Sequence, residues 1–251
     1  MSKIVDRRRP LVSLRALRIG LTDPLAAFNY AVSGKAGVIQ FQTKRLTKHI
    51  GATVGNLQEY WEAIASNQEL QAYTAKSLSG TYYGEVIAPD FLYVIVRMLR
   101  PEVVVETGVA AGISSAFILQ ALQDNNRGRL CSIDFPNYAL MDSSLIPEGK
   151  EPGFAIPPRL KERWNLRLGK SKDLLPSLLA ELGKSDIFLH DSEHTYDNMI
   201  FEYTTAWDYL AIGGLLLSHD ISWNNAFTDF ARKVRRKPTE IYFTGVGAIV
   251  K

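Results

Sequence analysis

The sequence has a single cysteine and no long run of apolar residues, and each absence excludes a class of protein. Cys131 has no partner for an intrachain disulfide and cannot contribute to a multi-cysteine zinc site. No apolar run approaches the roughly 18 residues that a membrane-spanning helix requires. The arginines at positions 7–9 precede neither a signal-peptide core nor a small-residue cleavage site. We therefore expect a cytoplasmic protein.

The chain does contain enough apolar material for one sizeable core, at 46% of 251 residues. This length and composition predict one α/β domain over residues 101–251, preceded by a helical N-terminal extension over residues 1–100. Helical periodicity runs through residues 57–78 and again through 91–99, where Pro89 and Asp90 give a start signal.

A strand, a glycine loop and a helix follow one another in residues 103–122. Three valines predict a short buried strand that ends near Glu106, and Gly108 and Gly112 lie in the loop before an apolar helical run at 116–122. Glycines let backbone amides approach a ligand, and the helix N-terminus adds partial positive charge. The order predicts a nucleotide-binding turn. Its spacing, E-x-G-x-x-x-G, differs from the dinucleotide fingerprint G-x-G-x-x-G.

An aspartate ends the next predicted strand, residues 130–134. Asp134 lies 22 positions after Gly112, where a doubly wound fold places the tip of its second strand. A carboxylate there can accept two hydrogen bonds from a ribose diol. The same acid would suit NAD, so this feature does not decide between cofactors.

Polar clusters follow two later strands. Residues 186–190 are followed by Asp191, Glu193 and His194, and then by a helix at 198–210 that the Gly213-Gly214 pair is expected to end. A strand at 215–217 is followed by His219 and Asp220. The carboxyl ends of parallel strands share one edge of a sheet, so we expect these side chains to meet. Asp191, His219 and Asp220 form a candidate site for Mg²⁺, or for Mn²⁺ because of the imidazole.

The glycine loop resembles motif I of the class I S-adenosylmethionine-dependent methyltransferases. The resemblance implies a doubly wound, Rossmann-like, seven-stranded sheet whose last strand is antiparallel, with a closing hairpin at 240–243 and 247–250. It also implies S-adenosylmethionine as the cofactor, with Glu106 at the methionine ammonium group. The resemblance also gives roles to other residues: Gly108 and Gly112 lie beneath the cofactor, Ser114 caps the helix, Asp134 binds the ribose, Ser171 lies near the adenine and Tyr83 belongs to an upstream lid. For Asp191, contact with the cofactor is the alternative to metal binding.

The segment from Asp191 to Tyr196 resembles the D-x-[DE]-H-x-Y segment of sugar and antibiotic O-methyltransferases. That resemblance implies methylation of a small-molecule or sugar hydroxyl, with Glu193 as general base and His194 as the competing candidate. The pair His219-Asp220 departs from the acidic or Asp-Asn pair of the metal-dependent enzymes. Trp223 and Phe227 would either floor the acceptor pocket or pack in the core.

Two other functions stay open. An NAD-dependent oxidoreductase is disfavoured by the glycine spacing and by the lack of a Tyr-x-x-x-Lys pair after the fourth strand. A catalytically silent binding protein on the same fold would dock on membrane or nucleic acid through residues 1–50, where ten Lys or Arg against two Asp give a net charge of +8. Peripheral membrane contact through this segment and a homo-oligomeric state are expectations. Nucleic acid is not expected as a substrate, because no Asn-Pro-Pro-aromatic turn follows the fourth strand.

Overall fold

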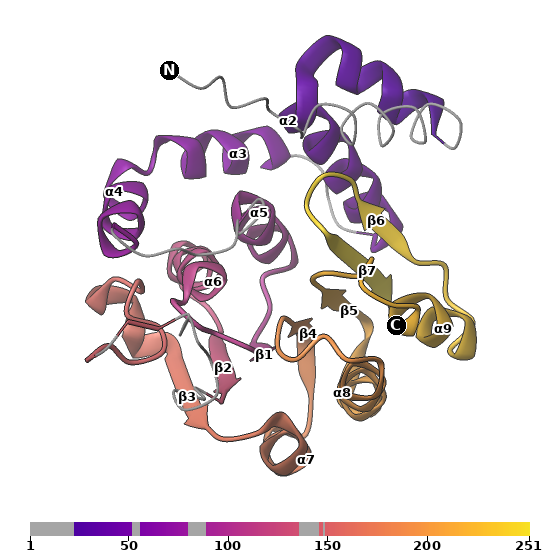
Figure 1. The fold of residues 1–251 in the computed structure, drawn as a ribbon. Helices are drawn as coiled ribbons and strands as arrows, with labels where there is room; N and C mark the ends of the chain where they lie inside the picture. The colour runs from indigo at the N-terminus through magenta and orange to yellow at the C-terminus, as the bar shows by residue number, and fades with distance from the viewer. Residues whose placement is uncertain (1–22, 52–55, 80–88, 136–145, 148) are drawn as a thin grey trace, which may run out of the picture.

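The computed structural model describes residues 23–51, 56–79, 89–135, 146–147 and 149–251. These residues build a seven-stranded sheet with helices on both faces (Figure 1). The predicted lid residue Tyr83 lies outside the described residues.

The sheet has the strand order β3-β2-β1-β4-β5-β7-β6. Its first five strands are parallel, β7 runs antiparallel to β5, and β6 runs antiparallel to β7. This confirms the predicted doubly wound sheet with its antiparallel closing hairpin. The strands are β1 Val103–Thr107, β2 Arg129–Asp134, β3 Trp164–Leu168, β4 Ser185–His190, β5 Leu210–Ser218, β6 Thr239–Ile241 and β7 Val246–Val250.

Two apolar cores lie on the two faces of the sheet. One core joins the sheet to α5 (Pro89–Leu99) and α6 (Ile113–Asp124), with α3 (Leu57–Ser66) and α4 (Gln68–Ser77) outside them. The other joins it to α7 (Ser171–Leu182), α8 (Tyr196–Tyr209) and α9 (Ala226–Lys233). Both faces of the parallel strands are therefore covered, which explains their nearly continuous apolar sequences.

The structure divides one predicted helical stretch and corrects two other predictions. The periodic stretch 57–78 is two helices, because Asn67 ends α3 and its side chain accepts a hydrogen bond of 3.0 Å from the Leu70 amide of α4. Helix α8 ends at Tyr209, and the Gly213-Gly214 pair lies inside β5 rather than between helix and strand. Ser114 does not cap α6, because Gly112 occupies the N-cap position and Ser114 is already helical.

The N-terminal extension includes a long helix, α2 (Pro24–His49), beside the β6–β7 hairpin (Figure 1). Gly34 has non-helical angles (φ 63°, ψ −158°) that kink this helix. Tyr30 stacks on Phe243 of the hairpin at 5.2 Å between ring centroids. Among the described residues, no helix is long and apolar enough to cross a membrane.

Candidate active site

The ends of three central strands lie in one register row. Thr107 of β1 is opposite His190 of β4, and His190 is opposite Ser218 of β5. Beyond this row the backbone stays paired, since the Asp191 amide donates to the Thr107 carbonyl at 2.8 Å and the His219 amide to the His190 carbonyl at 2.9 Å. The two polar clusters that follow β4 and β5 are therefore neighbours, as predicted.

The glycine loop touches the loop after β4 directly. Gly108 has φ +85°, and a Cβ built on it would lie 2.0 Å from the Asp191 carbonyl oxygen. No larger residue fits at this position without separating the two loops. The first glycine of the motif thus permits a close contact between two backbones of this chain.

A segment that sequence reasoning missed covers the rest of the glycine loop. The Gly153 amide donates to the Ala110 carbonyl at 2.8 Å, and the Ala155 amide donates to the Ala111 carbonyl at 2.9 Å. A Cβ on Gly112 would lie 2.7 Å from the Gly153 Cα. No periodic pattern marks this segment, because its pairing with the loop depends on tertiary contacts alone.

Glu106 is fully buried at the end of β1. Its Oε2 accepts hydrogen bonds from the Ser115 hydroxyl at 2.7 Å and the Ser132 hydroxyl at 2.8 Å. Its Oε1 has no hydrogen-bond partner in the part of the chain that the structure describes. Burial raises the pKa of Glu106 to about 8, although both serine hydrogen bonds oppose the shift. The unpaired oxygen can accept one further donor.

Asp134 lies at the tip of β2, and its Oδ1 accepts a hydrogen bond from the Val109 amide of the glycine loop at 3.3 Å. Burial raises the pKa of this carboxyl group against the opposing effect of backbone amides. Ser171 is the first residue of α7, and its hydroxyl donates to Asn198 Oδ1 at 3.4 Å. Asp134 and Ser171 therefore lie at the carboxyl ends of β2 and β3, the edge of the sheet at which the site was predicted.

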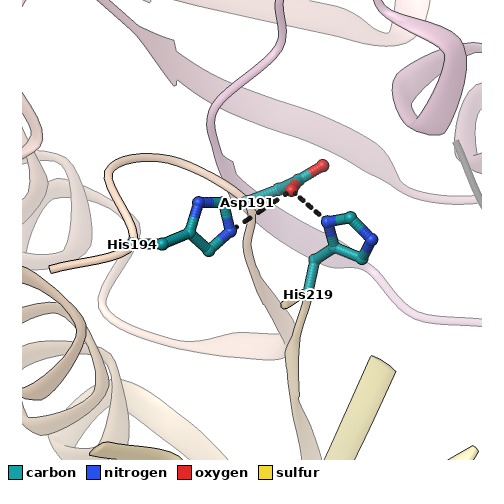
Figure 2. A group of neighbouring side chains, drawn as sticks. All are labelled: Asp191, His194 and His219. Carbon is teal, nitrogen blue, oxygen red and sulfur yellow. Dashed lines mark hydrogen bonds and ion pairs between the residues drawn. The ribbon is translucent and has the colours of Figure 1, made fainter. Parts of the chain in front are cut away.

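Asp191, His194 and His219 form the compact group shown in Figure 2. His219 Nδ1 lies 2.9 Å from Asp191 Oδ1, and His194 Nε2 lies 3.8 Å from the same oxygen. One ligand atom from each residue falls within 4.8 Å of the others. Asp220 Oδ2 is farther out, 3.7 Å from His219 Nδ1 and 3.9 Å from His194 Nε2. The predicted residues do meet, and His194 completes the compact group while Asp220 borders it.

The pKa values of His194 and His219 are shifted in opposite directions. Burial, together with the nearby His190 and His219, lowers the pKa of His194 against the opposing charges of Asp191 and Asp220. Burial also acts to lower the pKa of His219, but the hydrogen bond and charge of Asp191 outweigh it and raise that pKa. In both rings Nε2 is buried and has no hydrogen-bond partner among the described residues.

Glu193 lies outside this group. Its side chain is exposed and accepts a hydrogen bond from the Thr195 hydroxyl at 3.0 Å. Trp223 packs on His194 with 5.1 Å between ring centroids and remains 68% exposed, whereas Phe227 is buried in the core. The structure therefore separates the two aromatic residues: Phe227 packs, and Trp223 borders the site.

A buried carboxylate beneath the site, Glu202 of α8, was not predicted. Its Oε2 accepts from the Thr107 hydroxyl at 2.5 Å and contacts His190 Nδ1 at 2.6 Å. Its Oε1 accepts from the Ser192 hydroxyl at 2.7 Å and from the Asn198 side-chain amide at 3.1 Å. An acid inside the apolar helical face was the available signal, since Glu202 shares the face that carries the buried Met199, Tyr203 and Ala206.

The fold and the position of the site define a class of protein: a Rossmann-like domain with its site at the carboxyl ends of β1, β4 and β5, as in class I methyltransferases. Residues 105–221 match the model of a family described as a methyltransferase domain. Over these residues the chain therefore resembles a methyltransferase domain, as its glycine loop indicated, and its fold is the Rossmann-like methyltransferase fold.

Several solved structures have the same fold. A candidate O-methyltransferase from Klebsiella pneumoniae is 16% identical, with a TM-score of 0.51 over 73% of this chain and 89% of that chain. An O-methyltransferase from Bacillus cereus in complex with SAH is 14% identical, with a TM-score of 0.50 over 83% and 96% of the two chains. The cofactor-bound Rv0187 from MTB is 14% identical, with a TM-score of 0.52 over 73% and 88%. No curated protein matches the sequence. The family match gives no support to the oxidoreductase or to the silent binding protein.

Proposed function

We propose that this protein transfers the methyl group of S-adenosylmethionine to a hydroxyl oxygen of a small molecule or sugar. The observation that carries the proposal is the contact between the glycine loop at Gly108 and the backbone of Asp191. It brings a loop suited to the cofactor beside a cluster suited to a hydroxyl acceptor. The SAH bound in the Bacillus cereus enzyme supports the same choice of cofactor.

The buried acids of the first two strands fit the cofactor. Glu106 Oε1 is a buried acceptor without a described donor, which the methionine ammonium group would supply. Asp134 uses Oδ1 for the Val109 amide, which leaves Oδ2 for the ribose hydroxyls. Gly108 and Gly112 give the loop the positive φ values it needs. The other cofactor contacts proposed from the sequence are Ser114, Ser171, Asp191 and Tyr83.

The compact group fits a divalent metal. Two imidazoles and one carboxylate, with Nε2 of both rings lacking a described partner, favour Mn²⁺ or another transition metal over Mg²⁺. Asp191, His219 and His194 would hold the ion, and Asp220 would replace His194 if that ring serves as a base. A bound cation would lower the pKa of a hydroxyl group beside it.

The chemistry requires one proton to leave the acceptor. The hydroxyl oxygen forms a bond to the methyl carbon, the carbon–sulfur bond breaks, and S-adenosylhomocysteine leaves as a neutral thioether. His194 is suited to take the proton, because its lowered pKa keeps the ring neutral at neutral pH. Glu193 is the base if His194 holds the metal, and its exposed carboxylate would then act at the edge of the site.

Calorimetric titration with S-adenosylhomocysteine, before and after treatment with EDTA, tests the cofactor and the metal separately. Saturable binding is expected in both conditions, and Mn²⁺ should bind to the treated protein but not to His219→Ala. Loss of Mn²⁺ binding in Asp220→Asn would identify Asp220 as the third ligand, and loss in His194→Gln would identify His194. Methyl transfer to a panel of hydroxyl compounds then compares Glu193→Gln with His194→Gln to identify the base. Absence of S-adenosylhomocysteine binding would overturn the proposed function.

A further inference from the structure

The first half of α2 presents an apolar face that no described part of the molecule covers. Leu25, Phe28 and Val32 are 64%, 66% and 67% exposed, although large apolar side chains are mostly buried elsewhere in the described residues. Their spacing of three and four residues places them on one side of the helix. The opposite side carries Ala26 and Tyr30, which pack toward the β6–β7 hairpin.

The first half of α2, before the kink at Gly34, is more exposed than the second half. Residues 31–36 are all exposed, whereas the second half of α2 buries Val38 and Leu46. Three large apolar side chains grouped in this way are the usual mark of an interaction surface.

The positive charge near this face favours an anionic partner. Residues 24–33 contain no charged side chain, and the exposed bases Lys35, Lys44 and Lys48 follow on the same helix. Counted over the sequence, the first fifty residues have a net charge of +8, while the other residues have a net charge of −5. A second copy seated on the same face would bring two such basic segments together, which like charges oppose.

We propose that Leu25, Phe28 and Val32 insert into the surface of an anionic lipid bilayer, with the exposed Lys35, Lys44 and Lys48 of the same helix next to the headgroups. An apolar helical face beside clustered Lys and Arg binds such a surface by burial and by charge together. The enzyme would then act on acceptors that lie in or near a membrane surface. This docking surface does not depend on the proposed reaction.

Sedimentation of the full-length protein with vesicles tests the surface. Binding is expected to vesicles of mixed phosphatidylglycerol and phosphatidylcholine, and to weaken with salt. Leu25→Ser, Phe28→Ser and Val32→Ser combined should weaken it by about tenfold or more. Ile212→Ser is the matched control, because Ile212 is 85% exposed at the start of β5 and carries no part of the proposal.

The outcomes separate the possible partners. Unchanged circular dichroism with lost vesicle binding in the triple variant supports the proposal. Equal binding to pure phosphatidylcholine, or a triple variant that binds like the wild type, overturns it. Analytical ultracentrifugation that shows a dimer in the wild type and a monomer in the triple variant would also overturn it, because a second copy would then cover this face. Binding of S-adenosylhomocysteine should be equal in all these proteins.

Discussion

Replacing Glu106 by glutamine should remove a pH dependence from the stability of this protein. The carboxyl group is fully buried, its pKa is raised from 4.5 to about 8, and burial is the largest cause. The folded state therefore holds a proton that the unfolded chain loses above its ordinary pKa. The stabilisation from this group is complete below about pH 4.5 and is lost as the pH rises through about 8.

The expected size follows from the same shift. Between the two pKa values the folded protein binds up to one more proton, so the free energy of unfolding falls by up to about 1.4 kcal/mol for each pH unit. Glutamine keeps the shape and an oxygen for the two serine hydroxyls but cannot ionise. The stability of Glu106→Gln relative to the wild type should rise by about 2 to 3 kcal/mol between about pH 5.5 and about pH 7.5.

Urea unfolding of both proteins at a series of pH values measures this difference in the free energy of unfolding. Contributions from groups that titrate in both proteins cancel in the difference. Glu240→Gln, at an exposed position of β6, controls for the loss of one carboxyl group. A difference between Glu106→Gln and wild type that stays constant across this range would refute the burial argument.

Three further predictions follow from the same geometry. Binding of S-adenosylhomocysteine near pH 7 should release up to about one proton if its ammonium group pairs with Glu106, and calorimetry in buffers of different ionisation heat would detect it. Gly108→Ala should abolish that binding because of the 2.0 Å clash, whereas Gly183→Ala, with a similar positive φ of 70° and nothing within 4 Å, should cost only about 1 kcal/mol of stability and leave binding intact. Glu202→Gln should destabilise the protein by about 3 kcal/mol in urea unfolding, because an amide group replaces an acceptor for several donors. The lowered pKa of Glu202, which its hydrogen bonds produce against burial, makes this loss shrink as acid protonates the wild type.

The sequence was sufficient for the central strands β1, β2, β4 and β5, because each contains a short apolar run with a distinct break after it, whereas the seven-stranded order came from the family resemblance. The polar clusters could be placed together for the same reason, since strand ends in a parallel sheet share an edge. Asp191 and His219 are 28 positions apart in the chain, and only this rule predicts that they meet.

The sequence pattern could not predict features that depend on particular tertiary contacts. The glycine pair follows a general rule for breaks, yet β5 runs through it: Leu210 and Leu215 on either side both pair with β4, and the register shifts between them. The cover of the loop by residues 153–156 rests on backbone hydrogen bonds, which leave no periodic pattern of side chains in the sequence. Glu202 was missed because helical periodicity selects apolar residues, while its burial depends on donors that come from β1 and β4.

Two separate requirements select glycine at the two motif positions of this protein. One is the close approach of a ligand, and the other is contact with other parts of the same chain. Gly108 is required by the Asp191 carbonyl, and Gly112 by Gly153, so both would be needed even without a cofactor. The contact at Gly108 also fixes the distance between the loop proposed for the methyl donor and the cluster proposed for the acceptor. Glu202 reinforces it from below, because one carboxylate binds Thr107 before the first loop and Ser192 within the second. Alignment of donor and acceptor is the main requirement for methyl transfer, and in this fold it rests on these two contacts.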